Sequence, residues 1–318
     1  MDGVDVVLVR HGQAVSNVNS GEWRPDGLTD FGINSVHEFT RHTKLRNVHA
    51  IVSSCSARSI QTAQILAKAF ADLPKIHCRP EFQELTPWPY DQPINLQQSK
   101  GRLYAYTKLQ GGSEEDAGTL TRDQVVDMNP LDWPVMPHTS DLFPNREELE
   151  NRVMEARRWL RGLAKKVLED QPRSNIHGRP TIVVVCHGGF LNLFLGEYRC
   201  CFTRSSSSES WEWASSTTLS NLDAAVCSFA SLADQDAQLV EQEKSDEWSK
   251  VLGQHYRHLG SDPKRGGDVN HEQEYWLFWD RAAEEVRHQD KTLLHRLLLH
   301  QGWRLITSTA RWTLELLA

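Results

Sequence analysis

Two apolar segments that lie far apart in this chain both run directly into a histidine and a glycine. Residues 6–12 read VVLVRHG, and residues 181–189 read TIVVVCHGG. Short apolar runs rich in valine and isoleucine and bounded by glycine are typical of strands that are buried on both faces of a parallel sheet. Because α/β proteins place their chemistry at the carboxyl ends of such strands, His11 and His187 are the first candidates for a site.

The remaining hydrophobic pattern predicts alternating strands and helices. We expect strands at residues 48–53, 75–78 and 222–229, the last at the sheet edge, and helices at 30–43, within 53–70, at 145–166 and from 190 onward. Asn145, followed by Glu148 three residues later, forms a capping-box pattern at the start of the long helix. This alternation predicts an α/β fold: a three-layer sandwich with a mainly parallel central sheet and helices on both faces.

Two regions depart from this alternation. Residues 85–144 are rich in proline and show no sustained period, so we expect an inserted cap over the site. Residues 231–318 carry charge-rich helical stretches, and apolar residues within 294–316 repeat at steps of four and seven. We expect a C-terminal helical extension packed on a core domain of residues 1–230, with a dimer contact or a membrane surface as the alternatives for its apolar face.

Composition narrows the classes of function. The 318 residues carry a net charge of −7, which argues against general nucleic-acid binding because that requires a basic face. No apolar run reaches the roughly 18 residues that a membrane helix requires, and the N-terminus does not resemble a signal peptide. The six cysteines show no metal-ligand spacing, and the adjacent Cys200 and Cys201 are poor disulfide partners. We therefore expect a cytoplasmic protein with reduced thiols, no metal and no membrane contact.

Four motifs occur in a characteristic order. RHG occupies residues 10–12, SSCSARSIQTA occupies 53–63, Glu84 follows the expected third strand, and CHGG occupies 186–189. Together they resemble the histidine phosphatase superfamily, also called the phosphoglycerate mutase-like family, over roughly residues 4–230. The segments RHGQA, PEFQEL and WPYD look most like the branch that is widespread in fungi.

The resemblance implies a role for each of six residues. His11 would be the phosphorylated nucleophile and Glu84 the catalytic acid, with Glu81 as the alternative acid. The phosphate would be bound by Arg10, Arg58, His187 and Asn17. Asn17 could instead cap a turn. No cofactor is implied.

The chemistry of phosphate esters independently requires residues of these types. Hydrolysis of a phosphate monoester needs an acceleration of up to about 10²¹-fold, so the site must stabilise a large negative charge. The planar fork of arginine suits bidentate contact with phosphate oxygens. A nucleophilic His11 must be neutral at the attacking nitrogen, so its other ring nitrogen should donate to a backbone carbonyl, for example in the Gly12 turn. Attack would then give a phosphohistidine, with Glu84 donating a proton to the leaving oxygen and later taking one from water.

We therefore expect a metal-independent phosphatase that acts on a small phosphorylated molecule. One alternative is a phosphomutase, or an enzyme of specialised metabolism that acts on a phosphorylated or diphosphate intermediate. Gln13 and Ser16 differ from residues that are common in the family's mutases, which weakens the mutase alternative. Another alternative is a non-catalytic phosphate-binding scaffold. The sequence does not identify the substrate or the oligomeric state. Trp276 and Trp279 are expected in the core, or in a hydrophobic wall for a large substrate.

Overall fold

A central sheet organises the part of the chain that the computed structural model describes. This part comprises residues 3–18, 27–85, 146–170, 178–196, 219–234, 239–242, 246–257 and 276, together with the backbone of three further strands. The sheet has seven strands in the order β4-β3-β2-β5-β1-β8-β9. Their bounds are β1 (Asp5–Arg10), β2 (Val48–Ser53), β3 (Lys75–Cys78), β4 (Val125–Val126), β5 (Thr181–Cys186), β8 (Ala224–Phe229) and β9 (Leu239–Glu241). The strands from β4 to β1 are parallel, and β8 is antiparallel to β1.

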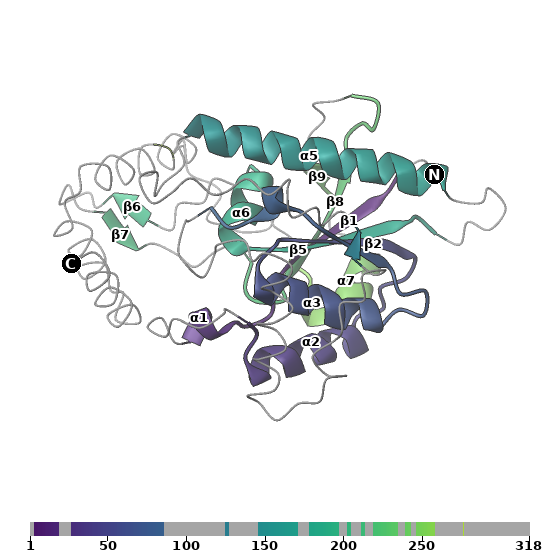
Figure 1. Ribbon diagram of the computed structural model, residues 1–318, viewed down its shortest axis with the longest axis horizontal. Helices are drawn as coiled ribbons and strands as arrows, with labels where there is room; N and C mark the ends of the chain where they lie inside the picture. Colours follow the sequence, from purple (N-terminus) through teal and green to yellow (C-terminus); the bar gives the residue numbers. More distant parts are fainter. Residues whose placement is uncertain are drawn as a thin grey trace.

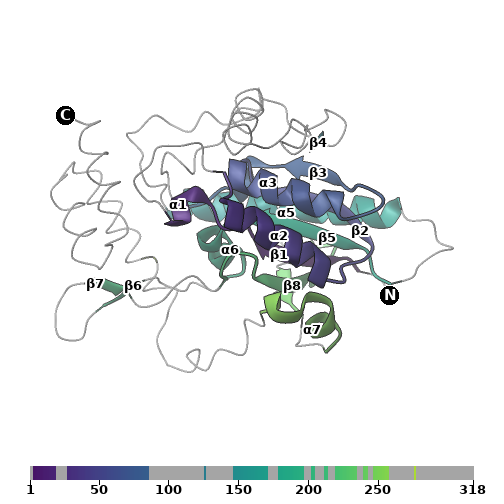
Figure 2. The same ribbon diagram turned by 90° about the horizontal axis from the view of Figure 1, so that it is seen from below.

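Helices cover both faces of this sheet, which confirms the predicted three-layer α/β architecture (Figures 1 and 2). One face carries α2 (Asp30–His42), α3 (Ala57–Lys68) and α7 (Asp246–Leu252), and the other carries α5 (Arg146–Glu169) and α6 (Gly188–Phe194). The short elements are α1 (Val15–Val18), two 3-10 turns, η1 (Pro80–Phe82) and η2 (Gly253–His255), and a separate hairpin of β6 (Phe202–Arg204) and β7 (Trp211–Trp213).

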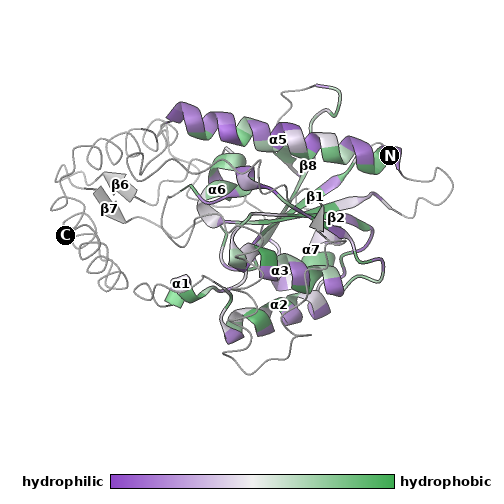
Figure 3. Cartoon of the chain, viewed as in Figure 1, coloured by the Kyte–Doolittle hydropathy of each residue, from purple (hydrophilic) through white to green (hydrophobic). Residues whose placement is uncertain are grey.

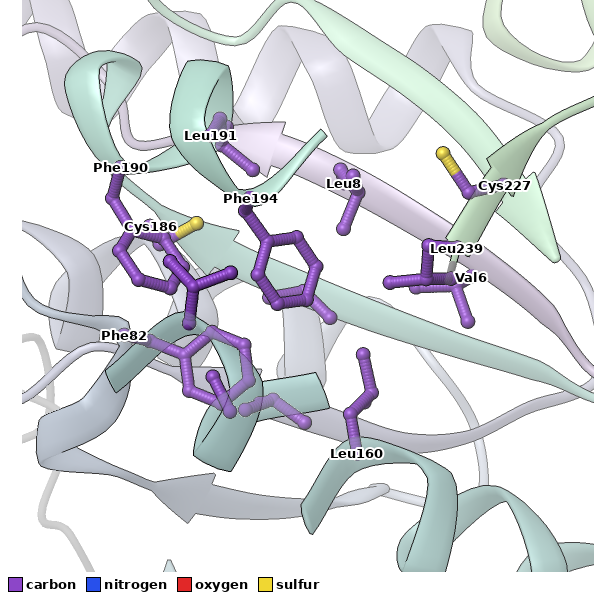
Figure 4. Packing of buried hydrophobic residues seen from close by; sticks show 14 of the residues in the cluster. Val6, Leu8, Phe82, Leu160, Cys186, Phe190, Leu191, Phe194, Cys227 and Leu239 are labelled. Atoms are coloured by element: carbon purple, nitrogen blue, oxygen red, sulfur yellow. The ribbon is translucent and has the colours of Figure 1, made fainter. Parts of the chain in front are cut away.

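The strands alternate their buried side chains between two hydrophobic clusters, because successive residues of a strand point to opposite faces. In β1, Leu8 packs on the α5 side and Val7 on the α2 and α3 side. On the α5 side, the ring of Phe82 lies 5.6 Å from that of Phe190 and 5.8 Å from that of Phe194 (Figure 4). Full burial of a side chain of this size stabilises the fold by about 1.5–3 kcal/mol.

Helix α5 shows how the sequence pattern selects one face for the core. Its buried residues recur at helical spacing, and hydrophilic and hydrophobic residues alternate along it in Figure 3. The helix continues to Glu169, three residues beyond the prediction, and its predicted cap Asn145 lies outside the described residues.

The structure corrects the prediction for the strand near residue 229. Strand β8 lies inside the sheet, because β9 pairs with it antiparallel at Cys227–Glu241 and Phe229–Leu239. The sheet and α7 thus include residues beyond 230, where we placed the end of the core domain. That domain boundary stays a prediction.

Several other expectations fall partly outside the described residues. Of residues 86–144, the structure describes only the backbone of β4, which pairs with β3. Trp276 is buried in the cluster on the α5 side, with the Arg146 guanidinium 4.7 Å from its ring centroid, which confirms its core position. Trp279 and residues 294–316 lie outside the described residues.

Cysteines and membrane spans can be checked in the described residues. Their four cysteines, Cys55, Cys78, Cys186 and Cys227, are buried and free, as expected, whereas Cys200 and Cys201 are not described. Among the helices described, none combines the length and the apolar character that crossing a membrane requires.

Two helical glycines should respond in opposite ways to substitution by alanine. Gly162 lies in the middle of α5 with no atom within 4 Å of an added Cβ, so Gly162→Ala should stabilise the protein by about 0.5–1 kcal/mol. A Cβ at Gly32, in the first turn of α2, would collide with the backbone carbonyl of Gln13. Gly32→Ala should therefore destabilise by about 1–3 kcal/mol. Urea unfolding measures both changes, and equal effects would contradict this packing.

Candidate active site

The two histidines identified from the sequence lie side by side at the carboxyl edge of the sheet. Strands β1 and β5 pair with Arg10 opposite Cys186, so His11 and His187 follow the paired strand ends. The backbone N–H of His11 donates to the Cys186 carbonyl at 3.0 Å. Both side chains are buried, and their ring centroids are 5.1 Å apart in an edge-to-face arrangement. The prediction that both histidines follow the carboxyl ends of buried strands is therefore confirmed, and the structure adds that these two strands pair.

Arg58 lies between the two imidazole rings. Its Nε–H donates to Nε2 of His11 at 3.1 Å, and its Nη2 is 3.1 Å from Nδ1 of His187. Arg58 stands in the first turn of α3, which begins after the Ser56 N-cap at the end of β2. A buried cation near a helix N-terminus is unfavourable for the helix dipole, and an anionic ligand there would offset that cost.

Hydrogen bonding fixes the proton positions on both rings. Nδ1 of His11 is 2.7 Å from the Gly12 carbonyl oxygen, which can only accept, so Nδ1 carries the proton and Nε2 carries the lone pair. This confirms the predicted bond to the Gly12 turn. In His187, Nδ1 faces the guanidinium, so the proton is on Nε2, 2.8 Å from the Ser54 hydroxyl oxygen.

Both histidines are held in the neutral form. Burial lowers the pKa of His11 well below its usual value, and the charges of Arg58 and Arg10 lower it further. Burial likewise lowers the pKa of His187, followed by the charge of Arg58. Neutral imidazole at His11 is the form that can act as a nucleophile.

Arg10 ends β1 and is anchored from the segment that precedes β8. Its Nη1 donates to the Leu219 carbonyl at 2.9 Å, and its backbone carbonyl accepts from the Leu222 N–H at 3.0 Å. The charge of Arg10 acts on both His11 and His187. The structure therefore brings Arg10 together with Arg58 around the histidine pair.

The carboxylate of Glu84 lies at the N-terminal turn of α6, directly after His187. Oε1 accepts from the Phe190 N–H at 2.9 Å, and Oε2 accepts from the Gly189 N–H at 3.3 Å. A Cβ on Gly189 would lie 2.6 Å from Oε1, so glycine is needed for this close approach. Glu81 instead pairs with Arg79 at 2.6 Å. Of the two acids, Glu84 reaches the backbone beside His187.

Asn17 closes the turn that follows the nucleophile segment. Its Oδ1 accepts from the Ala14 N–H at 2.9 Å and from the side chain of Asn221 at 3.3 Å. Asn17 therefore caps this turn, as the alternative interpretation of its role predicted. The side-chain amide nitrogen is then the atom of Asn17 that can donate to a phosphate oxygen.

Four residues around this constellation were not found from the sequence. Ser54 contacts His187, and Thr62 accepts from the Gly12 N–H at 3.1 Å. Asn221 donates to the His11 carbonyl at 2.8 Å. Arg152 on α5 donates to the Glu84 carbonyl at 3.3 Å, and its charge lowers the pKa of His187. Of these four, only Ser54 and Thr62 could have been noticed in the sequence, since both lie in the motif around Arg58.

The arrangement can bind and transfer an anionic group. Two guanidinium groups and a lone-pair nitrogen converge at the sheet edge, and a carboxylate lies next to His187. Within the described residues, no three His, Cys, Asp or Glu side chains are grouped so that they could hold a metal ion.

Comparison with known proteins gives one family match and several similar solved structures. Residues 6–100, which include β1, β2, α3, β3 and Glu84, match the model of the histidine phosphatase superfamily (branch 1). No curated protein sequence matches the chain. Similar solved structures include a phosphoglycerate mutase from Bacillus anthracis, with 16% identity, TM-score 0.44, and coverage of 79% of this chain and 96% of that one. An alpha-ribazole phosphatase from Shigella flexneri has 15% identity, TM-score 0.41 and coverage of 79% and 98%.

A mycobacterial glucosyl-3-phosphoglycerate phosphatase has 16% identity, TM-score 0.40, and coverage of 76% of this chain and all of that one. The narrower assignment to the branch widespread in fungi stays a prediction. The family match includes Arg10, His11, Arg58 and Glu84, whereas the strand-end motif with His187 lies beyond it. Residues 6–100 are therefore similar to the histidine phosphatase superfamily (branch 1).

Proposed function

We propose that this chain is a phosphatase that hydrolyses a phosphate monoester through a phosphohistidine on Nε2 of His11. The observation that carries the proposal is the state of this ring: Nδ1 is fixed to the Gly12 carbonyl, and Nε2 faces the Arg58 guanidinium. A lone pair held beside a buried cation is suited to attack a phosphorus atom whose oxygens that cation binds.

In the first step, Nε2 of His11 attacks phosphorus in line with the leaving oxygen. The N–P bond forms as the P–O ester bond breaks, and Glu84, as the carboxylic acid, gives its proton to the leaving oxygen. In the second step, water attacks phosphorus and the N–P bond breaks. Glu84 takes the proton from that water, which restores the enzyme and releases inorganic phosphate.

The charge of the transferred group would be met mainly by Arg58 and Arg10. A phosphoryl oxygen that takes over the Nε–H of Arg58 would expose the lone pair of His11, because that N–H now donates to Nε2. His187 would add a further contact from the neighbouring strand end. By analogy with oxyanion holes, each preorganised donor is worth about 3 kcal/mol in the transition state.

Glu84 is the better candidate for the acid because of where its carboxylate is held. Two N–H groups of α6 fix it beside His187, whereas Glu81 is engaged with Arg79. The Arg152 guanidinium contacts the Glu84 carbonyl and lies 5.7 Å from the Phe190 ring centroid, so it supports the same segment from α5.

The mutase and scaffold alternatives predict different products. A mutase would return the phosphoryl group to an organic product, whereas a phosphatase releases inorganic phosphate. A scaffold would be stabilised by phosphate without releasing any. We also propose, from the aromatic residues in segments 85–144 and 231–318 of the sequence, that the substrate is large or partly apolar. A panel of sugar phosphates, nucleotides, isoprenyl diphosphates and phosphopeptides tests this proposal, and turnover of small sugar phosphates alone would contradict it. The cytoplasmic location and the cap at residues 85–144 stay proposals.

Replacement of the nucleophile should abolish turnover and leave the fold intact. His11→Ala should reduce phosphate release from p-nitrophenyl phosphate to background, because it removes the nitrogen on which the proposed N–P bond forms. His42→Ala, on the exposed surface of α2, is the matched control and should retain wild-type turnover. Circular dichroism should show both variants folded. Unchanged turnover in His11→Ala would refute the proposed mechanism.

Because the pKa of His11 is lowered in the folded chain, the free energy of unfolding should decrease as the pH decreases. Below the usual histidine pKa of 6.5, the unfolded chain binds a proton at His11 that the folded chain does not, so this residue makes stability fall as pH decreases through that value. Urea unfolding between pH 8 and 5.5 should show a smaller decrease for His11→Gln than for wild type. The acid limb of kcat/KM should lie well below 6.5. An acid limb at 6.5 would contradict a buried neutral nucleophile.

Displacing the Glu84 carboxylate should slow protonation of the leaving group. Gly189→Ala places a Cβ against Oε1, so kcat should fall toward that of Glu84→Gln. Loss of a general acid costs about 10²- to 10⁴-fold for an alkyl phosphate, which has a poor leaving group. The loss should be smaller for p-nitrophenyl phosphate, whose leaving group needs little protonation. Equal losses with both substrates would argue against an acid role for Glu84.

A further inference from the structure

The turn that precedes β8 contacts the nucleophile segment at several atoms. The Leu219 carbonyl accepts from the Arg10 side chain, and the Leu222 N–H donates to the Arg10 carbonyl. The Arg10 N–H in turn donates to the Asp223 carbonyl at 3.2 Å. Residues 219–223 thus form a clamp along the end of β1, immediately before His11.

The clamp is held in an unusual backbone conformation. Leu222 has a φ of +63°, in the left-handed region, and its side chain is buried in the core cluster on the α2 and α3 side. A residue with a Cβ stays in this region only where its surroundings fix it. Here Asp223 supplies that constraint, since its carboxylate accepts from the Ser220 N–H at 2.8 Å and pairs with Arg257 at 3.0 Å.

This conformation directs the side chain of Asn221 at the site. Its Nδ2 is 2.8 Å from the His11 carbonyl oxygen and 3.3 Å from Oδ1 of Asn17. The orientations of both amides follow from their partners. The Ala14 N–H can only donate, so Asn17 must present its oxygen there. Asn221 then faces two acceptors and must present its nitrogen.

We propose that Asn221 is a positioning residue of the phosphohistidine site, which holds the His11 backbone and orients the Asn17 amide through one side-chain nitrogen. This inference rests on the proposed function. One bond restrains the carbonyl of the nucleophile itself. The other occupies Oδ1 of Asn17, so that Nδ2 is the polar atom of Asn17 that remains to meet a phosphate oxygen.

Substitutions at Asn221 separate this role from a general structural one. Asn221→Ala removes both bonds, and Asn221→Asp keeps the shape but presents a carboxylate to two acceptor oxygens. Ser220→Ala is the matched control in the same turn, because the contacts of Ser220 to Asp223 come from its backbone. Asn17→Ala and the double variant Asn17→Ala/Asn221→Ala test the coupling of the two amides.

Two readouts are needed for these variants: kcat with p-nitrophenyl phosphate, and thermal stabilisation by inorganic phosphate, which requires no turnover. Loss of one net hydrogen bond of about 1.4 kcal/mol corresponds to about a tenfold change, so kcat of Asn221→Ala should fall about tenfold. The kcat of Asn221→Asp should fall further, because its carboxylate would face two acceptor oxygens. Phosphate binding should weaken equally in Asn221→Ala, Asn17→Ala and the double variant, whereas Ser220→Ala should match wild type.

Each outcome decides for or against the positioning role. Wild-type kcat and phosphate binding in Asn221→Ala would overturn it, as would an equal loss in Ser220→Ala or additive losses in the double variant. If Asn221→Ala does not fold, a folded Asn221→Asp with wild-type phosphate binding would also overturn it. If wild type shows no turnover, the proposed phosphatase function fails. Non-additive loss of phosphate binding would then still support the positioning of Asn17 by Asn221.

Discussion

The hydrogen bond from Nδ1 of His11 to the Gly12 carbonyl is the constraint on which the whole site depends. It fixes the proton on one nitrogen and leaves the lone pair on the other, toward Arg58. Gly12 is held in turn by Thr62, whose hydroxyl also donates to the Arg58 carbonyl at 2.8 Å. The first turn of α3 therefore positions both the nucleophile and the cation that faces it.

The buried charges explain why the site should prefer an anion. Arg58 is buried among two neutral rings, and Arg10 adds to the same positive field. A phosphoryl group bound here would place negative charge beside Arg58 and would oppose the effect of Arg58 on the pKa of His187. The same interactions that keep both rings neutral thus favour a phosphate ligand, although the chain as a whole carries a net charge of −7.

The sequence predicted those parts of the site that depend on local pattern and on strand ends. Two apolar runs place His11 and His187 at strand ends, and the parallel pairing of β1 with β5 in the structure brings them together. The N-cap at Ser56 likewise places Arg58 near the end of β2. Asn221 and Arg152 could not be found in this way, because their roles depend on a left-handed turn and on how α5 packs. The position of β9 was missed since its three residues show no distinct apolar period.

The most direct test of the central claim is to locate phosphate on the enzyme during turnover. A reaction stopped rapidly with alkali, in which phosphohistidine is stable, can be digested and analysed by mass spectrometry and ³¹P NMR. The account predicts one modified residue, His11, with phosphorus bonded to Nε2, because Nδ1 is engaged by the Gly12 carbonyl. Phosphate on Nδ1, on His187 or on Glu84, or turnover with no covalent intermediate, would contradict it.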